Sequence, residues 1–246
     1  MKIGILVCGH LSEPLAAVYG QYSNMIATAF QAVNDEMIFA EYEAFNQQLP
    51  NLDECDGYIV TGSVCNAFDD APWIVDLMSW VQRCEARRIP LVGICFGHQL
   101  IARALGGTVG RSEKGWGLGS YEVNIVAQKR WMNFSIDRLR MLVSHQDQVI
   151  TVPKGMRVIA SNEFCPNFML AKDNHLFTIQ GHPEFTLDFM SQLVEQRKYL
   201  ISEEQYLATF EQAKEVLDSA IVLHWIDSFF VFNTESIQDP SFAQLV

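Results

Sequence analysis

The chain has 246 residues, 49% of them hydrophobic and 19% charged, which suits a globular protein with a sizeable core. Its 29 acidic and 17 basic side chains give a formal net charge of −12, which argues against nucleic acid or an anionic membrane surface as a partner, because both attract basic surfaces. No apolar run reaches the ~18–20 residues of a membrane span. The six cysteines form no CxxC pair, so we expect neither a zinc site nor a disulfide framework, and we predict a cytoplasmic protein with reduced thiols.

The first hundred residues alternate short apolar runs with helical patterns. The runs are of the length of buried strands, and the helical patterns repeat an apolar residue every three or four positions. Strands are predicted over residues 3–8, 37–42, 57–60 and 91–94, and helices over residues 19–32, from Pro72 onward and after residue 95. This alternation predicts an α/β fold with a doubly wound, mostly parallel sheet, in which reactive groups lie at the carboxyl ends of the strands.

The pattern changes after residue 107. Short strand-like runs between turns predict an antiparallel extension of the sheet, over residues 121–127, 139–143, 149–151, 158–160, 168–171 and 176–180. Helices then return: Thr186 can cap residues 187–200, Ser202 opens a capping box for a helix towards Leu217, and residues 221–230 are apolar on nearly all sides. We expect one main domain over residues 1–200 and a C-terminal helical extension over residues 201–246 that packs on it.

Cys95 lies at a sharp transition from strand to helix. Gly93 and Gly97 flank it two residues away on each side, and a helical pattern follows. The spacing is that of the G-x-S-x-G nucleophile elbow, with sulfur in place of oxygen, and the helix N-terminus beside the sulfur favours the thiolate. A free cysteine is often only a small buried hydrophobe. The flanking glycines and the following helix favour a nucleophile instead.

A cysteine nucleophile needs a base, commonly a histidine that a carboxylate or amide orients. His182 follows a predicted strand in the segment Gly181-His182-Pro183-Glu184. In an extended segment, residues two apart share a face, so Glu184 can accept a hydrogen bond from the imidazole and orient it. His145, in Ser144-His145-Gln146-Asp147, is the second candidate base; substrate binding and loop closure are the other roles open to it.

Chemistry at an acyl carbonyl also needs hydrogen-bond donors for the oxyanion. The backbone N–H of Phe96 directly follows the nucleophile, as in the nucleophile elbow. A second donor is predicted at Gly62 or Ser63, at the end of a neighbouring strand. Turns at strand ends often contain glycine for structural reasons alone, so the residues by themselves do not decide which of the two supplies the second donor.

Taken together, these segments resemble the class I (triad) glutamine amidotransferases, above all the glutaminase domain of GMP synthase and its free-standing relatives. The resemblance covers roughly the first 190–200 residues, a single domain by size, and implies a flavodoxin-like fold. The motifs that carry it are Thr61-Gly62-Ser63, Gly93-Ile94-Cys95-Phe96-Gly97-His98-Gln99, Ala104-Leu105-Gly106-Gly107, Gly115-Trp116-Gly117-Leu118-Gly119, Ser144-His145-Gln146-Asp147 and Gly181-His182-Pro183-Glu184.

The resemblance implies that this is a cysteine hydrolase of the glutaminase type. It would convert the glutamine side-chain amide to glutamate and ammonia through a γ-glutamyl thioester at Cys95. His182 would act as base and then as acid, Glu184 would orient it, and the backbone N–H groups of Gly62 and Phe96 would stabilise the oxyanion. The positions implied to contact glutamine are Gln99, Ser144, His145, Gln146 and Asp147. No metal or organic cofactor is implied.

Two departures from the family pattern leave alternatives open. Gln146 stands where the synthetase-linked domain typically has glycine, and no phosphate-cradling glycine loop of a synthetase is present, so any ammonia acceptor is expected to be an unidentified separate chain, an acceptor or synthetase subunit. A first alternative is a γ-glutamyl peptidase that cleaves glutathione-like or other γ-glutamyl compounds through the same thioester. A second alternative is a non-catalytic regulatory or partner domain.

Overall fold

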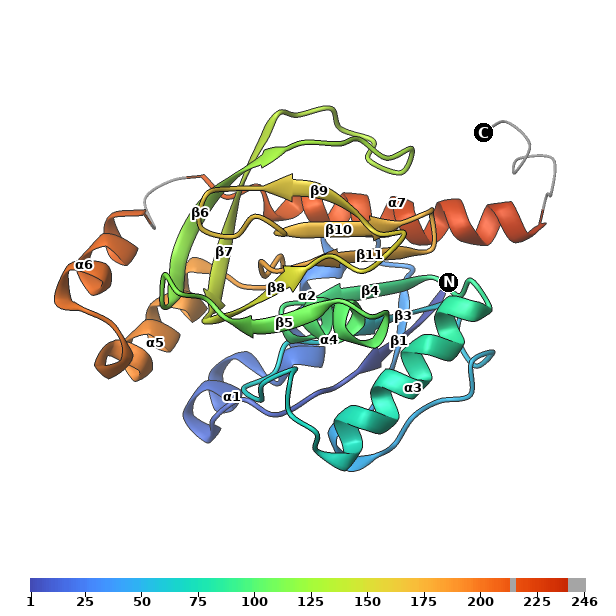
Figure 1. Ribbon diagram of the computed structural model, residues 1–246, viewed down its shortest axis with the longest axis horizontal. Helices are drawn as coiled ribbons and strands as arrows, with labels where there is room; N and C mark the ends of the chain where they lie inside the picture. Colours follow the sequence, from blue (N-terminus) through green and yellow to red (C-terminus); the bar gives the residue numbers. More distant parts are fainter. Residues whose placement is uncertain (213–215, 239–246) are drawn as a thin grey trace.

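A nine-stranded mixed sheet forms the centre of the computed structural model, which describes residues 1–212 and 216–238 (Figure 1). In sheet order the strands are β2 (Ile38–Tyr42), β1 (Lys2–Leu6), β3 (Gly57–Val60), β4 (Leu91–Ile94), β11 (Leu176–Ile179), β10 (Met169–Lys172), β9 (Arg157–Ser161), β6 (Gly117–Ile125) and β7 (Arg138–His145). From β2 to β11 in this order neighbouring strands are parallel, and from β11 to β7 they are antiparallel. This confirms the predicted doubly wound sheet with an antiparallel extension.

Helices cover both faces of the parallel half of the sheet. Helices α2 (Tyr22–Gln31) and α7 (Ser219–Gln238) pack on one face, and α3 (Pro72–Ala86) and α4 (Phe96–Ala104) pack on the other. Successive strand side chains point to opposite faces, so both faces of a parallel strand are apolar. In β1, for example, Ile3 and Ile5 join the core under α2 and α7, whereas Leu6 joins the core under α3 and α4.

Helix α7 packs directly against the sheet, as its nearly all-apolar sequence predicts. Val222, Trp225, Ile226 and Phe229 are fully buried in the core on that face. The helix comes so near that a Cβ on Gly57 of β3 would lie 2.6 Å from Cε1 of Phe230. The helix therefore covers the middle of the parallel sheet and shields from water the strands that carry the candidate site.

The main departures from the predicted elements lie near the two ends of the parallel half. The helix predicted over residues 19–32 is present as α2, but a helix that was not predicted, α1 (Glu13–Tyr19), precedes it and ends at Gly20, whose positive φ of 75° separates the two helices. A strand that was not predicted, β5 (Thr108–Arg111), pairs with β8 (Asp147–Thr151) in a separate two-stranded sheet. Its side chains are partly exposed throughout, so it lacks the apolar run that marks the other strands.

The predicted helix caps near the C-terminus are present. Thr186 Oγ1 accepts a hydrogen bond from the backbone N–H of Phe189 at 3.1 Å and begins α5 (Leu187–Arg197), which the 3₁₀ turn η2 (Lys198–Leu200) follows. Ser202 and Gln205 form the reciprocal capping box of α6 (Glu203–Gln212). The continuation of α6 towards Leu217 and the end of the predicted extension fall partly on residues 213–215 and 239–246, which lie outside the described residues.

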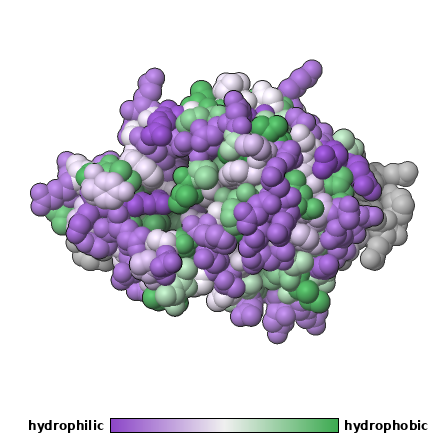
Figure 2. Space-filling view, turned by 90° about the horizontal axis from the view of Figure 1, so that it is seen from below, coloured by the Kyte–Doolittle hydropathy of each residue, from purple (hydrophilic) through white to green (hydrophobic). Residues whose placement is uncertain are grey.

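The surface carries few large apolar areas on the face drawn in Figure 2, where hydrophobic side chains form small, separate patches among hydrophilic ones. Among the described helices, none combines the length and apolar character needed to cross a lipid bilayer.

A short 3₁₀ turn, η1 (Ala44–Asn46), completes the described helical elements.

Candidate active site

The residues singled out in the sequence lie at the carboxyl ends of adjacent strands. Gly62 follows β3, Cys95 follows β4, and His182 follows β11, and these three strands are neighbours in the sheet. Parallel strands bring their carboxyl ends to the same edge, so residues far apart in the chain meet there. Strand β7 reaches the same region, since the backbone N–H of His182 donates to the carbonyl of Leu142 at 2.9 Å.

Cys95 is held in a strained backbone conformation between β4 and α4. Its φ of 51° and ψ of −100° are unusual for a residue with a side chain and cost roughly 1–3 kcal/mol. The backbone N–H of Cys95 donates to the carbonyl of Ile179 at 2.8 Å, which ties the elbow to β11. A Cβ on Gly97 would lie 2.3 Å from the carbonyl oxygen of Val60, so this tight turn requires glycine there. The elbow predicted from the sequence is therefore present.

Phe96 is the first residue of α4, directly after the sulfur. The first N–H groups of a helix have no partner inside that helix, so the Phe96 amide is a suitable donor for an oxyanion formed at Cys95. Gly62 also lies beside Cys95. A Cβ on Gly62 would lie 3.1 Å from Cε1 of His182 and 3.9 Å from Cβ of Cys95, so its backbone is adjacent to both residues.

His182 and Glu184 form a buried pair. Nδ1 of His182 and Oε1 of Glu184 are 2.7 Å apart, and the two side chains are only 4% and 1% exposed. The imidazole also stacks on Phe185, with ring centroids 3.8 Å apart and planes 7° from parallel. These contacts fix the orientation of the ring and leave Nε2 for another partner.

The charge state of His182 follows from its neighbours. Burial by itself lowers the pKa of His182, but the Glu184 carboxylate and the Cys95 sulfur outweigh burial and raise the pKa to about 10. The imidazolium is therefore the favoured form at neutral pH, paired with Glu184 and beside Cys95. An imidazolium next to a nucleophilic sulfur can donate a proton to a leaving amine.

Gln180 contacts the sulfur and was not among the predicted site residues. It is fully buried, and its Nε2 donates to Sγ of Cys95 at 3.5 Å. Its Oε1 accepts from Nε2 of Gln99 at 3.1 Å, and that Nε2 also donates to the backbone carbonyl of Asp147 at 2.7 Å. The sequence holds one signal for Gln180: it is a polar residue directly before Gly181-His182-Pro183-Glu184.

A cavity of about 350 Å³ opens at Cys95 and contains the remaining predicted residues. Gln99, Ser144, His145 and Gln146 all line it, together with Cys95 and Phe96. Gln99 is only 3% exposed, and its amide N–H groups already donate to Gln180 and Asp147, so it also connects α4 to the start of β8.

His145 also lines the cavity, and among the described residues its ring makes no hydrogen bond to Cys95. Its Nδ1 lies 3.0 Å from the backbone carbonyl of Asp147. Burial lowers the pKa of His145 to about 4, so its imidazole is neutral. Of the two histidines considered as the base, His182 is the one that contacts both a carboxylate and the region of Cys95.

Comparisons with known proteins identify the family of this chain. The family model described as glutamine amidotransferase class-I matches residues 15–200. Gamma-glutamyl peptidase 3 of Arabidopsis thaliana is 31% identical over 218 residues, which cover 85% of this chain and 86% of that protein. The A subunit of the glutamine-hydrolyzing GMP synthase of Sulfolobus acidocaldarius is 31% identical over 177 residues, 69% of this chain and 88% of that protein.

A solved structure shows the same fold. The crystal structure of a glutamine amidotransferase from Thermotoga maritima has a TM-score of 0.72 to this chain at 20% identity, and the match covers 93% of this chain and 96% of that one. The family model spans well over half of the chain, and the relatives cover most of its length. This chain belongs to the class I glutamine amidotransferase family.

Proposed function

We propose that this protein hydrolyses γ-glutamyl amide bonds, with Cys95 as nucleophile, His182 as base and then acid, and Glu184 as the residue that orients His182. One observation carries the proposal: the strained Cys95 elbow is adjacent to an imidazole that a buried carboxylate holds at 2.7 Å. Such a set is the arrangement that cysteine hydrolases use to activate a thiol.

The reaction runs in two steps. The Cys95 thiolate attacks the γ-carbonyl carbon, forming a C–S bond, and the carbonyl π electrons move to the oxygen, where the backbone N–H groups of Gly62 and Phe96 donate to the oxyanion. The intermediate collapses, the C–N bond breaks, and the His182 imidazolium protonates the leaving amine. Water, deprotonated by His182, then attacks the thioester, the C–S bond breaks, and glutamate is released with the thiolate restored.

The substrate-binding role proposed for Gln99, Ser144, His145 and Gln146 is to hold the γ-glutamyl group in the cavity. All four line the cavity that opens at Cys95, which supports this role. With glutamine as substrate, the products are glutamate and ammonia, and a separate acceptor chain would take up the ammonia. The GMP synthase relative supports such a partner, because its name is that of one subunit of a larger enzyme.

The second candidate is hydrolysis of γ-glutamyl peptides. It is favoured by gamma-glutamyl peptidase 3 of Arabidopsis thaliana, which matches this chain over 85% of its length, whereas the GMP synthase relative covers 69%. Both candidates pass through the same thioester, so they differ only in the leaving group.

Purified protein should be assayed with glutamine for ammonia and with γ-glutamyl dipeptides for the freed amino acid. Cys95→Ala should lose either activity, while Cys55→Ala, a partly exposed cysteine away from the cavity, should keep it. An acyl-enzyme trapped by acid quench and located on Cys95 by mass spectrometry would complete the test. No turnover of either substrate and no acyl-enzyme, with or without a cell extract to supply an acceptor chain, would leave the non-catalytic alternative.

A further inference from the structure

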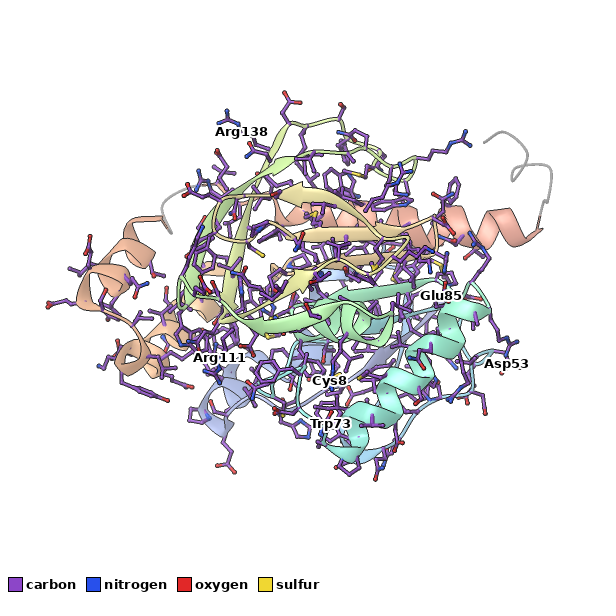
Figure 3. The ribbon with its side chains drawn as sticks, viewed as in Figure 1. Cys8, Asp53, Trp73, Glu85, Arg111 and Arg138 are labelled. Carbon is purple, nitrogen blue, oxygen red and sulfur yellow. The ribbon has the colours of Figure 1, made fainter. Side chains whose placement is uncertain are left out.

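The cavity at Cys95 has an unusual charge distribution for so acidic a protein. The residues that line it include Arg111, Arg197 and Asp147 as the charged side chains, which sum to +1, whereas the chain as a whole carries −12. Arg111 comes from the end of β5 and Arg197 from the last turn of α5, so two distant segments bring their guanidinium groups to one cavity. Figure 3 shows Arg111 on the side of the molecule where α5 lies.

Hydrogen bonds to neutral side chains orient both guanidinium groups and leave their positive charges in place. Arg111 Nη1 donates to Oε1 of Gln146 at 2.7 Å, and Arg197 Nη1 donates to Oγ of Ser144. Arg197 also lies over the ring of Trp116, with Cζ 5.5 Å from the ring centroid. Within residues 1–212 and 216–238, neither guanidinium has a carboxylate within the 4.0 Å of an ion pair. Each therefore keeps free N–H donors for an anionic group in the cavity.

Asp147 supplies the opposite charge. Its Oδ1 is buried and has no hydrogen-bond partner among the described residues, which is costly unless a ligand supplies a donor. Burial raises the pKa of Asp147, and the Arg111 guanidinium opposes that rise, so Arg111 and Asp147 are electrostatic neighbours. A neighbouring cation and anion suit the α-carboxylate and α-ammonium groups of a γ-glutamyl moiety.

We propose that the physiological substrate is a γ-glutamyl amino acid or peptide with a free C-terminal carboxylate, in which Arg111 and Asp147 bind the α-carboxylate and α-ammonium groups and Arg197 binds the carboxylate of the leaving group. Such a substrate has two carboxylates and one ammonium group and so carries −1, which complements the +1 of the cavity. Glutamine has one of each and leaves Arg197 without an anion. The inference rests on the proposed γ-glutamyl hydrolysis and names its substrate class.

The test compares three substrates on the same enzyme: γ-glutamylglycine, γ-glutamylglycinamide and glutamine. The first carries the leaving-group carboxylate, and the other two lack it. We expect kcat/KM for γ-glutamylglycine to exceed that for γ-glutamylglycinamide by about tenfold or more, the effect of a hydrogen-bonded charge pair. Arg197→Gln should lower kcat/KM for γ-glutamylglycine far more than for γ-glutamylglycinamide, which brings this ratio to about one, and Arg197→Lys should restore part of the ratio.

Two further variants complete the design. Arg111→Gln should lower kcat/KM for all three substrates by a similar factor, because each has the same γ-glutamyl group. Arg87→Gln, on an exposed arginine that lines a different cavity, is the matched control and should behave as wild type. Equal kcat/KM for the dipeptide and its amide, or a ratio that Arg197→Gln leaves unchanged, overturns the substrate assignment while hydrolysis itself stands. Absence of hydrolysis of all three substrates would instead refute the proposed function.

Discussion

Replacing Gln180 by leucine tests whether the amide beside Cys95 contributes to catalysis. Leucine keeps most of the side-chain volume in a fully buried site but removes the N–H that donates to Sγ at 3.5 Å. A hydrogen bond to a charged group contributes about 1.5–3 kcal/mol, and this one is long, so the lower value applies. At about 1.4 kcal/mol for each factor of ten, kcat/KM should fall by about tenfold.

The stability cost of Gln180→Leu should be small. Nε2 of Gln99 loses one acceptor but keeps the carbonyl of Asp147 at 2.7 Å, so the free energy of unfolding should fall by only about 1 kcal/mol. A second readout follows the sulfur directly: alkylation by iodoacetamide at neutral pH requires the thiolate, and its rate should fall with kcat/KM.

Gln148→Leu is the control for this substitution. Gln148 is also buried and also donates one side-chain hydrogen bond, to the carbonyl of Phe164 at 3.1 Å, but it has no contact with the sulfur. It should keep wild-type kcat/KM and alkylation rate. If Gln180→Leu is folded and stays within about twofold of wild type in both measurements, the hydrogen bond to Cys95 has no catalytic role.

Three further predictions concern the site and the core. Gly62→Ala should lower kcat by about 10–100-fold, because its Cβ would lie 3.1 Å from Cε1 of His182 and displace the ring; unchanged steady-state kinetics would contradict this. Trp225→Ala in α7 should lower the free energy of unfolding by about 3–5 kcal/mol in urea titrations, since Trp225 is fully buried; a loss below about 1 kcal/mol would show that the helix contributes little. The folded-state pKa of His182 is about 10, raised from 6.5, so the stabilisation from its pair with Glu184 is complete below about pH 6.5 and is lost as pH rises through about 10. The difference in unfolding free energy between wild type and Glu184→Gln should therefore be largest near about pH 6 and smallest above about pH 10, and a difference independent of pH would refute the ion pair.

Local sequence patterns were sufficient for the framework of this protein. The alternation of apolar runs and helical patterns predicted the parallel half of the sheet, and the glycines around Cys95 predicted the elbow, because strand periodicity and tight turns depend on residues close together in the chain. The segment with His182 and Glu184 was predicted for the same reason, since two residues in one extended stretch share a face. The assignment of residues 1–200 and 201–246 to a main domain and an extension stays a prediction.

Other features depend on how distant segments meet. Gln180 reaches Cys95 only because β11 pairs beside β4, although the two residues are 85 positions apart. Arg111 and Arg197 share a cavity only because β5 leaves the main sheet to pair with β8 while the last turn of α5 comes to the end of β7. Strand order and helix docking are set by the packing of the whole core, and no local pattern encodes them. Local motifs therefore predict the chemistry expected of Cys95, His182 and Glu184, whereas the packing of distant segments sets which charges and amides surround these three residues.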